Sequence, residues 1–489
     1  MCEKNEAEAL QERLCRKNEH FMKSHGDELA AADAFCEGYK AFLQNAKTER
    51  ECNAAVIAEA KRRGFVPFDP FASYQCGDKV YADNRGKSVI LCVFGKKSVG
   101  EGVRIVASHI DSPRLDMKPT PLYEDAELAY LKTHYYGGLR KYQWLSRPLA
   151  LHGVIVKDTG ETVPVRIGDE PGDPVFCIAD LLPHLAQKQV TQSVREAFEG
   201  EKLNVILGSI PRPEEEAEKE QAQAKEGDKA KKAKDPLAAS PVKGAVLDLL
   251  QEKYGVCEED FITAEIEVVP AASASYVGFD RSLVGGYGQD DRICVYTALQ
   301  ALCDAREDCS KNIALMIWDK EEIGSDGATG ASSRFLQYCF EDVARAHEPG
   351  TPASHVLLAS QALSADVTAG MDPDYQDAHE KSNAASLGNG PCFEKYTGSG
   401  GKYGASEAHA EFYASVRGIL NRAGIPWQAG ELGRVDHGGG GTVALFLAAY
   451  GMNVVDFGPP LLAMHSPFEL SSAADVWACY LAYKAFYEA

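Results

Sequence analysis

The chain has 489 residues, of which 45% are hydrophobic and 25% charged, a composition typical of globular proteins and not of disordered, collagenous or membrane-spanning chains. Its 51 basic and 72 acidic residues give a net charge of −21, which argues against nucleic-acid partners because Lys and Arg bind phosphate backbones. No apolar run reaches the ~18 residues of a membrane span, and no signal-peptide pattern is visible. The 14 cysteines form no C-x-x-C pair. We therefore expect a cytoplasmic protein with reduced thiols and no membrane partner.

The first predicted elements are helices followed by buried strands. Between residues 29 and 63, apolar residues recur every three or four positions, which predicts core-facing helices. Two short runs rich in Val and Ile follow at 88–94 and 103–109, and both are predicted to be strands. The chain thus begins as an α/β protein.

A β-rich segment interrupts this pattern from about residue 118 to 268. It contains predicted strands at 149–156 and 163–167, followed by helices. Residues 211–240 hold mainly charged residues and Ala, with almost no large apolar side chain, so burial cannot offset the entropy lost on ordering them. We predict a mobile charged surface loop there, with a partner-binding role as the less favoured alternative.

Strand and helix alternate after residue 277. Helices are expected at 294–302, 332–340, 406–423, 442–450 and 473–487, and strands at 313–318, 355–363 and 454–457. This alternation predicts an α/β fold in which a mixed central sheet is flanked by helices on both faces.

Polar residues follow five of the apolar runs. They are His109 and Asp111; Asp290 and Asp291; Asp319, Glu321 and Glu322; Asp366; and His465. Each set has a structural alternative: a hydrogen-bonded pair, a helix N-cap, an acidic surface turn, or a single structural acid or histidine. Together, the histidines and carboxylates supply the nitrogen and oxygen ligands of a paired divalent-metal site at the carboxyl ends of strands.

The same residues resemble the M18, or aspartyl aminopeptidase, family of zinc aminopeptidases. The matching motifs run in order over nearly the whole chain: Ser108-His109-Ile110-Asp111-Ser112-Pro113, Gly137-Gly138, Asp290, Asp319 to Ser325, Ser364-Ala365-Asp366 and Met464-His465-Ser466. The resemblance implies a catalytic domain made of 1–117 and 269–489, interrupted by a dimerisation domain at 118–268. It also implies a homodimer that builds a dodecamer.

The resemblance further implies two divalent ions per subunit, most often Zn²⁺. Carried over position by position, one ion is bound by His109 and Asp366, and Asp290 bridges the two. Glu322 and His465 hold the other ion. Asp291 is the competing bridge, but the family's bridge lies two places before the position of Arg292.

The implied general base is Glu321. It would take a proton from the water that attacks the first peptide carbonyl and return that proton to the leaving amine. Asp111 would orient the imidazole of His109.

Three residues are candidates for substrate binding: His184, Glu394 and Lys395. His184 matches a family histidine that reaches toward the substrate, with a helix-surface histidine as the alternative. Aspartate-selective members carry a histidine where this chain has Ala369, and their substrate-contacting lysine aligns with Glu394 or Lys395. An acidic preference is therefore not expected, and a pocket containing Glu394 would favour a basic or neutral first residue.

The sequence predicts a metal-dependent aminopeptidase that acts on the N-terminus of peptides. Two alternatives remain: an amidase or deacylase with the same metal pair, and an inactive scaffold protein. The complete ligand set and Glu321 argue against the scaffold.

Overall fold

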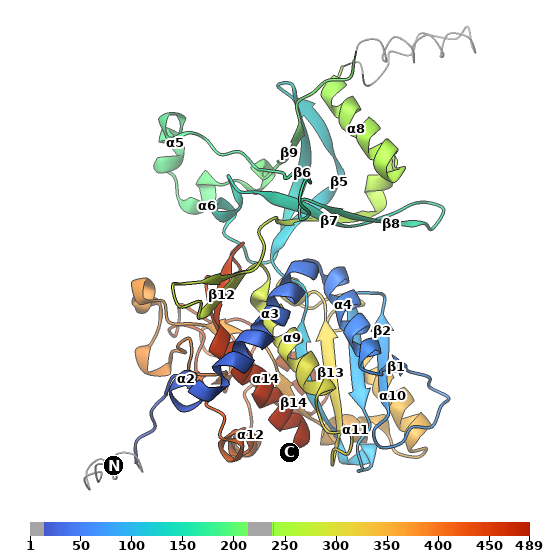
Figure 1. Cartoon of the computed structure of the whole chain (residues 1–489), viewed down its shortest axis with the longest axis vertical. Coiled ribbons are helices and arrows are strands. Elements are labelled where there is room, and N and C mark those ends of the chain that lie inside the picture. The colour runs from blue at the N-terminus through green and yellow to red at the C-terminus, as the bar shows by residue number, and fades with distance from the viewer. Residues whose placement is uncertain (1–13, 214–236, 238) are drawn as a thin grey trace. The chain divides into compact units, whose positions relative to one another are not determined.

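A computed structural model describes residues 14–213, 237 and 239–489. They divide into two compact units, each described by itself below (Figure 1). The first unit comprises Met1–Asp111, Ala274–Met464 and Phe468–Ala489, and the second comprises Ser112–Ser273 and His465–Pro467. Most of the charged segment predicted at 211–240 lies outside the described residues. None of the helices in the described ranges has both the length and the apolarity to cross a bilayer.

A nine-stranded mixed sheet forms the centre of the first unit. Its strands, in spatial order, are β1 (Val66–Pro67), β2 (Lys79–Asn84), β3 (Ser88–Val93), β13 (Asn312–Trp318), β4 (Val103–His109), β14 (Gln361–Ser364), β18 (Asn453–Gly458), β16 (Cys392–Glu394) and β17 (Gln428–Gly430). The four central strands β13, β4, β14 and β18 run parallel. Their carboxyl ends therefore meet at one edge of the sheet, where ligand sites of α/β proteins form.

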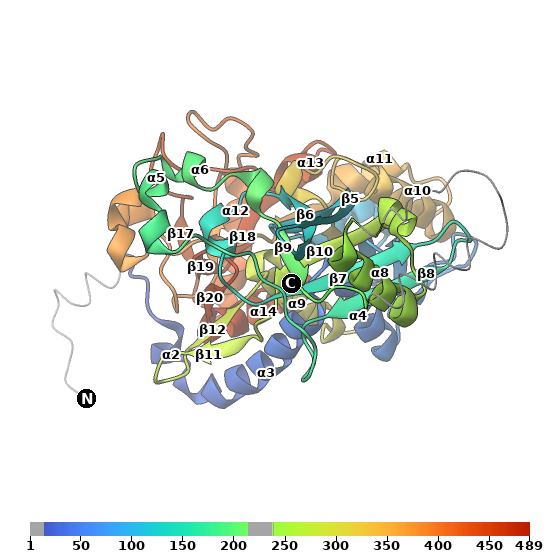
Figure 2. The same ribbon diagram turned by 90° about the horizontal axis from the view of Figure 1, so that it is seen from above.

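Helices cover both faces of this sheet, as Figure 2 shows for α3 and α4 on one side and α10, α11 and α13 on the other. The helices of this unit are α2 (Phe21–Ser24), α3 (Leu29–Asn45), α4 (Glu49–Arg62), α9 (Gln289–Cys303), α10 (Phe335–His347), α11 (Ala353–Ala359), α12 (Ala410–Ala423), α13 (Ala444–Ala448) and α14 (Ala473–Glu488). Alternate residues of β13 enter opposite cores: Leu315 packs with α3 and α9, while Met316 packs with α10 and α11. The predicted α/β fold with a mixed sheet covered on both faces is confirmed.

The predicted strand at 355–363 is half wrong. Residues Ala353–Ala359 form the helix α11, and the strand β14 begins only at Gln361. Pro352 occupies the N-cap of this helix, and Val356 and Leu357 are buried. A short apolar run of this kind fits a buried helix turn as well as a strand, so its periodicity did not separate the two.

A second, five-stranded sheet belongs to the same unit. Its strands, in spatial order, are β11 (Ser275–Val277), β12 (Leu283–Gly286), β20 (Glu469–Ser472), β19 (Pro460–Leu462) and β15 (Thr368–Ala369). Strand β12 leads directly into α9. Strand β20 pairs with β12, and in this pairing Glu469 lies opposite Gly286. This sheet therefore supports the start of α9.

The second unit is built on a six-stranded antiparallel sheet. Its strands, in spatial order, are β8 (Thr162–Ile167), β7 (Leu149–Val156), β10 (Ala264–Pro270), β5 (Arg114–Asp125), β6 (Leu128–Tyr136) and β9 (Val205–Gly208), and its helices are α5 (Gln187–Val190), α6 (Val194–Ala197) and α8 (Pro241–Tyr254). Strands β7 and β8 occupy the two runs predicted at 149–156 and 163–167.

Candidate metal centre

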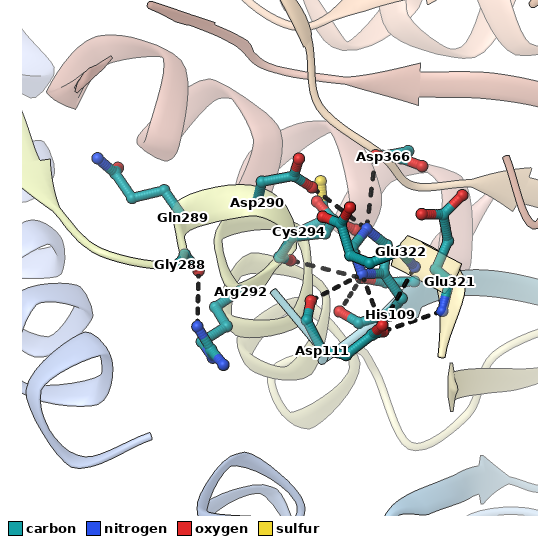
Figure 3. Close-up of polar contacts among 12 residues, drawn as sticks. His109, Asp111, Gly288, Gln289, Asp290, Arg292, Cys294, Glu321, Glu322 and Asp366 are labelled. Atoms are coloured by element: carbon teal, nitrogen blue, oxygen red, sulfur yellow. Dashed lines mark hydrogen bonds and ion pairs between the residues drawn. The ribbon is translucent and has the colours of Figure 1, made fainter. Parts of the chain in front are cut away.

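The candidate ligands of the first unit meet because three parallel strands end side by side. Strand β4 ends at His109, which is in register with Trp318 at the end of β13. On its other side β4 pairs with β14, whose last residue, Ser364, precedes Asp366 by two positions. Figure 3 shows the carboxylates of Asp290, Glu321, Glu322 and Asp366 around the ring of His109.

His109 lies at the middle of this cluster and is buried. Its Nε2 is 3.2 Å from Oδ1 of Asp290 and 3.8 Å from Oδ1 of Asp366. Its Nδ1 is 3.1 Å from the backbone carbonyl oxygen of Asp111, which accepts a hydrogen bond when Nδ1 carries the proton. That tautomer leaves the Nε2 lone pair free to bind a metal ion.

Asp111 connects the end of β4 with the turn that follows β13. Its Oδ1 accepts a hydrogen bond from the backbone N–H of Glu321 at 3.0 Å, and its Oδ2 accepts one from that of Glu322 at 3.1 Å. Oδ1 is also 3.4 Å from Nδ1 of His109. One buried carboxylate thus fixes both the imidazole and the two glutamates.

Two groups of side chains in the first unit have their ligand atoms within 4.8 Å of one another. One consists of His109, Asp291 and Asp366, and the other of His109, Glu321 and Glu322. Carboxylate oxygens of Asp290 and Glu322 also lie within 4.8 Å of each other. His109 approaches several of these acids, and Asp290 approaches both His109 and Glu322.

The charges of this cluster fit a divalent cation. Burial, followed by the charges of neighbouring acids, raises the pKa of Asp366 and lifts that of Asp291 well above its usual range. Burial also raises the pKa of Glu321 to about 8. Burial alone would lower the pKa of His109, but hydrogen bonds with Asp111, Asp290 and Asp366 raise it well above its usual range. Imidazole nitrogen and carboxylate oxygen are zinc ligands, and a cation would offset the repulsion among the acids.

The two candidate bridging acids point to different partners. Asp290 approaches Nε2 of His109, whereas Oδ2 of Asp291 accepts a hydrogen bond from Oγ of Ser108 at 2.5 Å. The peptide bond that joins the two aspartates is cis, and both have non-helical backbone angles at the start of α9. The backbone angles at these two residues therefore differ from those of the regular helix that follows.

Two predicted site residues belong to the second unit. His465 lies in the short segment His465–Pro467, and its Nδ1 is 2.8 Å from the carbonyl oxygen of Gly138. A proton on Nδ1 would leave its Nε2 free for a metal ion, as in His109. His184 is exposed in a short 3₁₀ helix, Pro183–Leu185.

Glu394 and Lys395 have opposite environments. Glu394 ends β16, is buried, and accepts a hydrogen bond from Oγ1 of Thr368. Burial raises its pKa to about 8. Lys395 is exposed, with its Nζ 3.7 Å from a carboxylate oxygen of Glu407. Of the two, Glu394 is held inside the protein near Thr368, which follows Asp366 by two residues.

Two further residues contact the cluster and were not among the predicted site residues. Ser108 donates to Asp291, and Glu469 accepts hydrogen bonds from the backbone N–H groups of Gln289 and Asp290. Ser108 is the first residue of the motif that contains His109 and Asp111, so the sequence could have indicated it. Glu469 lies far from Asp290 in sequence, and only the fold brings them together.

Both the sequence and the fold of this chain match those of known proteins. Residues 42–487 match the profile of the family described as aminopeptidase I zinc metalloprotease (M18). A relative from Thermotoga maritima, called a probable M18 family aminopeptidase 1, is 46% identical over 459 residues, which cover 93% of this chain and 96% of the relative.

Solved structures of similar proteins share the whole fold. The crystal structure of an M18 aminopeptidase from Thermotoga maritima superposes with a TM-score of 0.87 at 44% identity, covering 97% of this chain and 99% of that one. Aminopeptidase I from Clostridium acetobutylicum gives a TM-score of 0.85 at 41% identity, covering 97% and 100%.

The mApe1 dodecamer of S. cerevisiae shares the fold at 19% identity, with a TM-score of 0.70 and coverage of 94% of this chain and 97% of that one. The family predicted from the motifs is confirmed by the profile match and by the relatives of more than 40% identity. The chain therefore belongs to the M18 family of zinc metallopeptidases and is a metal-dependent aminopeptidase.

Proposed function

We propose that the protein removes N-terminal amino acids from peptides at a centre of two zinc ions in each subunit. The observation that carries this proposal is the position of His109, whose Nε2 faces Asp290 and Asp366 while Glu321 and Glu322 approach from the neighbouring turn. A single ion would leave several of these buried and half-buried carboxylates without a cation.

The ligand assignment follows from these approaches together with the family resemblance. His109 and Asp366 would hold one ion, Glu322 and His465 would hold the other, and Asp290 would serve both. The contact of Asp290 with His109 and its nearness to Glu322 support the bridging role. Asp291 accepts a hydrogen bond from Ser108 and also lies within 4.8 Å of His109 and Asp366, so it remains the competing candidate, and the family resemblance favours Asp290.

Glu321 is the general base of the proposed reaction. It accepts a proton from the attacking water and then donates it to the nitrogen of the leaving peptide, so the residue ends each cycle as it began. Bound divalent ions would supply Lewis acidity toward water and the peptide carbonyl. Asp111 holds the backbone of Glu321 and Glu322, so that one carboxylate faces the metals while its neighbour remains available for proton transfer.

The substrate's free α-amine is attracted by the excess of carboxylates in this cluster. Beyond the cluster, we propose Glu394, Lys395 and His184 as substrate-binding residues. Glu394 is the buried one of the pair formed with Lys395, which supports a preference for basic or neutral first residues over acidic ones.

The proposal also covers the oligomeric state of the protein and its location in the cell. We propose that residues 118–268 form a dimerisation domain inserted into a catalytic domain of 1–117 and 269–489, and that dimers build a dodecamer like the mApe1 assembly. A cytoplasmic location is supported by the cysteines, since the 13 within the described residues are all free thiols.

The decisive experiment is hydrolysis of aminoacyl anilides by the purified protein, with Asp, Glu, Leu, Lys, Arg and N-acetyl-Leu as the acyl groups. We expect release from free-amine substrates, greatest for Leu, Lys or Arg, and loss of activity with a chelator. Glu321→Gln should reduce kcat by roughly 10²- to 10⁴-fold while zinc content stays at two ions per chain by atomic absorption.

Other outcomes would redirect the proposal. Cleavage confined to N-acetyl-Leu would indicate a deacylase, and one zinc ion per chain in the fully active enzyme would refute the dinuclear centre. Wild-type activity in Glu321→Gln would remove the assigned base.

A further inference from the structure

Glu469 is a buried acid that holds the backbone at the start of α9. Its Oε2 accepts hydrogen bonds from the backbone N–H of Gln289 at 2.6 Å and from that of Asp290 at 3.2 Å. Its own backbone carbonyl oxygen accepts a hydrogen bond from Nε2 of Gln289 at 2.7 Å. The residue is 2% exposed.

The side chain of Gln289 also fixes this part of the backbone through hydrogen bonds of its own. Its Nε2 also donates to the carbonyl oxygen of Val284, and its Oε1 accepts hydrogen bonds from the hydroxyls of Ser471 and Tyr39. Figure 3 shows Gln289 pointing away from the cluster while Asp290, the next residue, points toward His109. The backbone between them is thus fixed on the side opposite to the candidate ligand.

The first turn of a helix needs such partners, because its N–H groups have no acceptor within the helix. At α9 the turn is also irregular, since Asp290 and Asp291 depart from helical backbone angles. A carboxylate that accepts from two successive N–H groups satisfies these donors and selects one orientation of the peptide that carries Asp290.

We infer that Glu469 is a positioning residue for Asp290: it sets the bridging carboxylate in place from outside the metal site. This inference rests on the proposed role of Asp290 as a metal ligand. Strand β20, which begins at Glu469, follows His465 by four residues, so one short segment supports the metal site twice, through a ligand and through the backbone of another ligand.

The chain offers a matched control in Asp475. This carboxylate is fully buried in the first turn of α14 and also accepts hydrogen bonds from two backbone N–H groups, those of Gly388 at 2.6 Å and Gly390 at 2.7 Å. It holds a loop that carries none of the proposed ligands. Its removal therefore has the same structural cost without the same effect on zinc.

The test compares zinc affinity of the full-length protein, measured by competition with a chromophoric chelator, in Glu469→Ala, Glu469→Gln, Asp475→Ala and Asp290→Asn. Thermal unfolding of the zinc-free forms reports the structural cost separately. We expect Glu469→Ala to weaken zinc binding on the order of 10- to 100-fold, the usual effect of removing a partner that orients a ligand. Glu469→Gln keeps an oxygen acceptor and should restore most of the affinity, while Asp475→Ala should lower only the unfolding temperature.

The other outcomes would contradict either the positioning role of Glu469 or the proposed role of Asp290 as a metal ligand. Unchanged zinc affinity in Glu469→Ala, or an equal loss in Asp475→Ala, would overturn the positioning role. If Asp290→Asn binds zinc as the wild type does, Asp290 is not a ligand, and the proposed centre fails together with the inference. Loss in Asp290→Asn without loss in Glu469→Ala refutes the inference and leaves the proposed function intact.

Discussion

At the scale of single residues, three buried carboxylates among the described residues hold backbone N–H groups in place. Asp111, Glu469 and Asp475 each accept hydrogen bonds from two backbone N–H groups. Hydrogen bonds to an ionised acceptor are stronger than neutral ones and are expensive to lose in a buried place. Three loops or turns are fixed in this way, and two of them carry proposed ligands.

Asp111→Ala should weaken the proposed centre from outside it. The variant frees the N–H groups of Glu321 and Glu322 and removes the carboxylate beside Nδ1 of His109. We expect zinc affinity and kcat to fall on the order of 10- to 100-fold. Chelator competition and steady-state kinetics measure both quantities.

A suitable control for this prediction is Asp304→Asn, which removes a surface ion pair with Arg63. Surface pairs of this kind contribute about 0–1 kcal/mol, so zinc affinity should not change. Wild-type affinity in Asp111→Ala would show that His109 keeps its orientation without this carboxylate.

The raised pKa of Asp475 predicts that the stability of the protein depends on pH. Burial raises its pKa in the folded protein to about 7, while an unfolded aspartate has a pKa near 3.9. Between about pH 4 and pH 7 the folded state therefore binds more protons than the unfolded state, and this residue's contribution to stability is lost as the pH rises. Asp475→Asn removes that dependence.

Denaturant unfolding at a series of pH values from 4.5 to 8 checks this prediction. The free energy of unfolding of the wild type should fall relative to that of Asp475→Asn as the pH rises toward about 7. A constant difference across this range would contradict the raised pKa.

At the scale of elements, the turn after β13 decides how the two adjacent glutamates are presented. Lys320 adopts a left-handed backbone conformation with φ of 71°, and its Nζ lies 3.1 Å from Oδ2 of Asp319. The same oxygen accepts a hydrogen bond from Oγ1 of Thr329 at 2.8 Å, and the backbone N–H of Asp319 donates to the Thr329 carbonyl. These contacts close the turn before Glu321 begins its 3₁₀ helix.

Thr329→Val should loosen this turn while keeping nearly the same side-chain volume at position 329. The hydroxyl donor to Asp319 is lost, so we expect a loss of about 1 kcal/mol in the free energy of unfolding. Since Glu321 is the proposed general base, we expect kcat to fall by roughly 10-fold with little change in KM. Thermal unfolding and steady-state kinetics measure the two effects.

Thr133→Val provides the comparison, because it removes a buried threonine hydroxyl that donates to the carbonyl of Leu203 in the second unit. Its stability should fall while kcat remains that of the wild type. Equal kcat in Thr329→Val and the wild type would show that the turn holds Glu321 without this bond.

At the scale of the whole molecule, we expect metal binding and folding to be coupled. The buried acids around His109 repel one another, and the raised pKa values of Asp366 and Glu321 express that repulsion together with burial. A cation that binds only the folded chain stabilises it by mass action. The site thus lowers the stability of the metal-free protein.

Removal of zinc should therefore lower the melting temperature, and its return should raise it. At a free zinc concentration of 100 times Kd, the expected stabilisation is about 2.7 kcal/mol for each ion bound, measured by calorimetry of the chelator-treated and reloaded protein. Magnesium at the same concentration controls for ionic strength. Identical melting temperatures with and without zinc would contradict a centre formed by these residues.

Local patterns and motif order were enough to predict the chemistry of this protein. Strand periodicity placed His109 and Asp319 at the ends of apolar runs, and the sheet rule predicted that such ends would meet. The order of motifs identified the family, because residue types and spacings are written directly in the chain. It also predicted most elements, since strands such as Asn312–Trp318 are long, apolar and clearly bounded.

Which of two adjacent candidates faces which partner became clear from the folded structure. Asp290 approaches His109 while Asp291 turns to Ser108, and Glu394 is buried while Lys395 is exposed, although each pair is adjacent in sequence. Glu469 reaches the start of α9 through the pairing of β20 with β12, a contact between segments about 180 residues apart. Such choices depend on backbone angles and long-range packing, which local patterns of hydrophobicity do not contain.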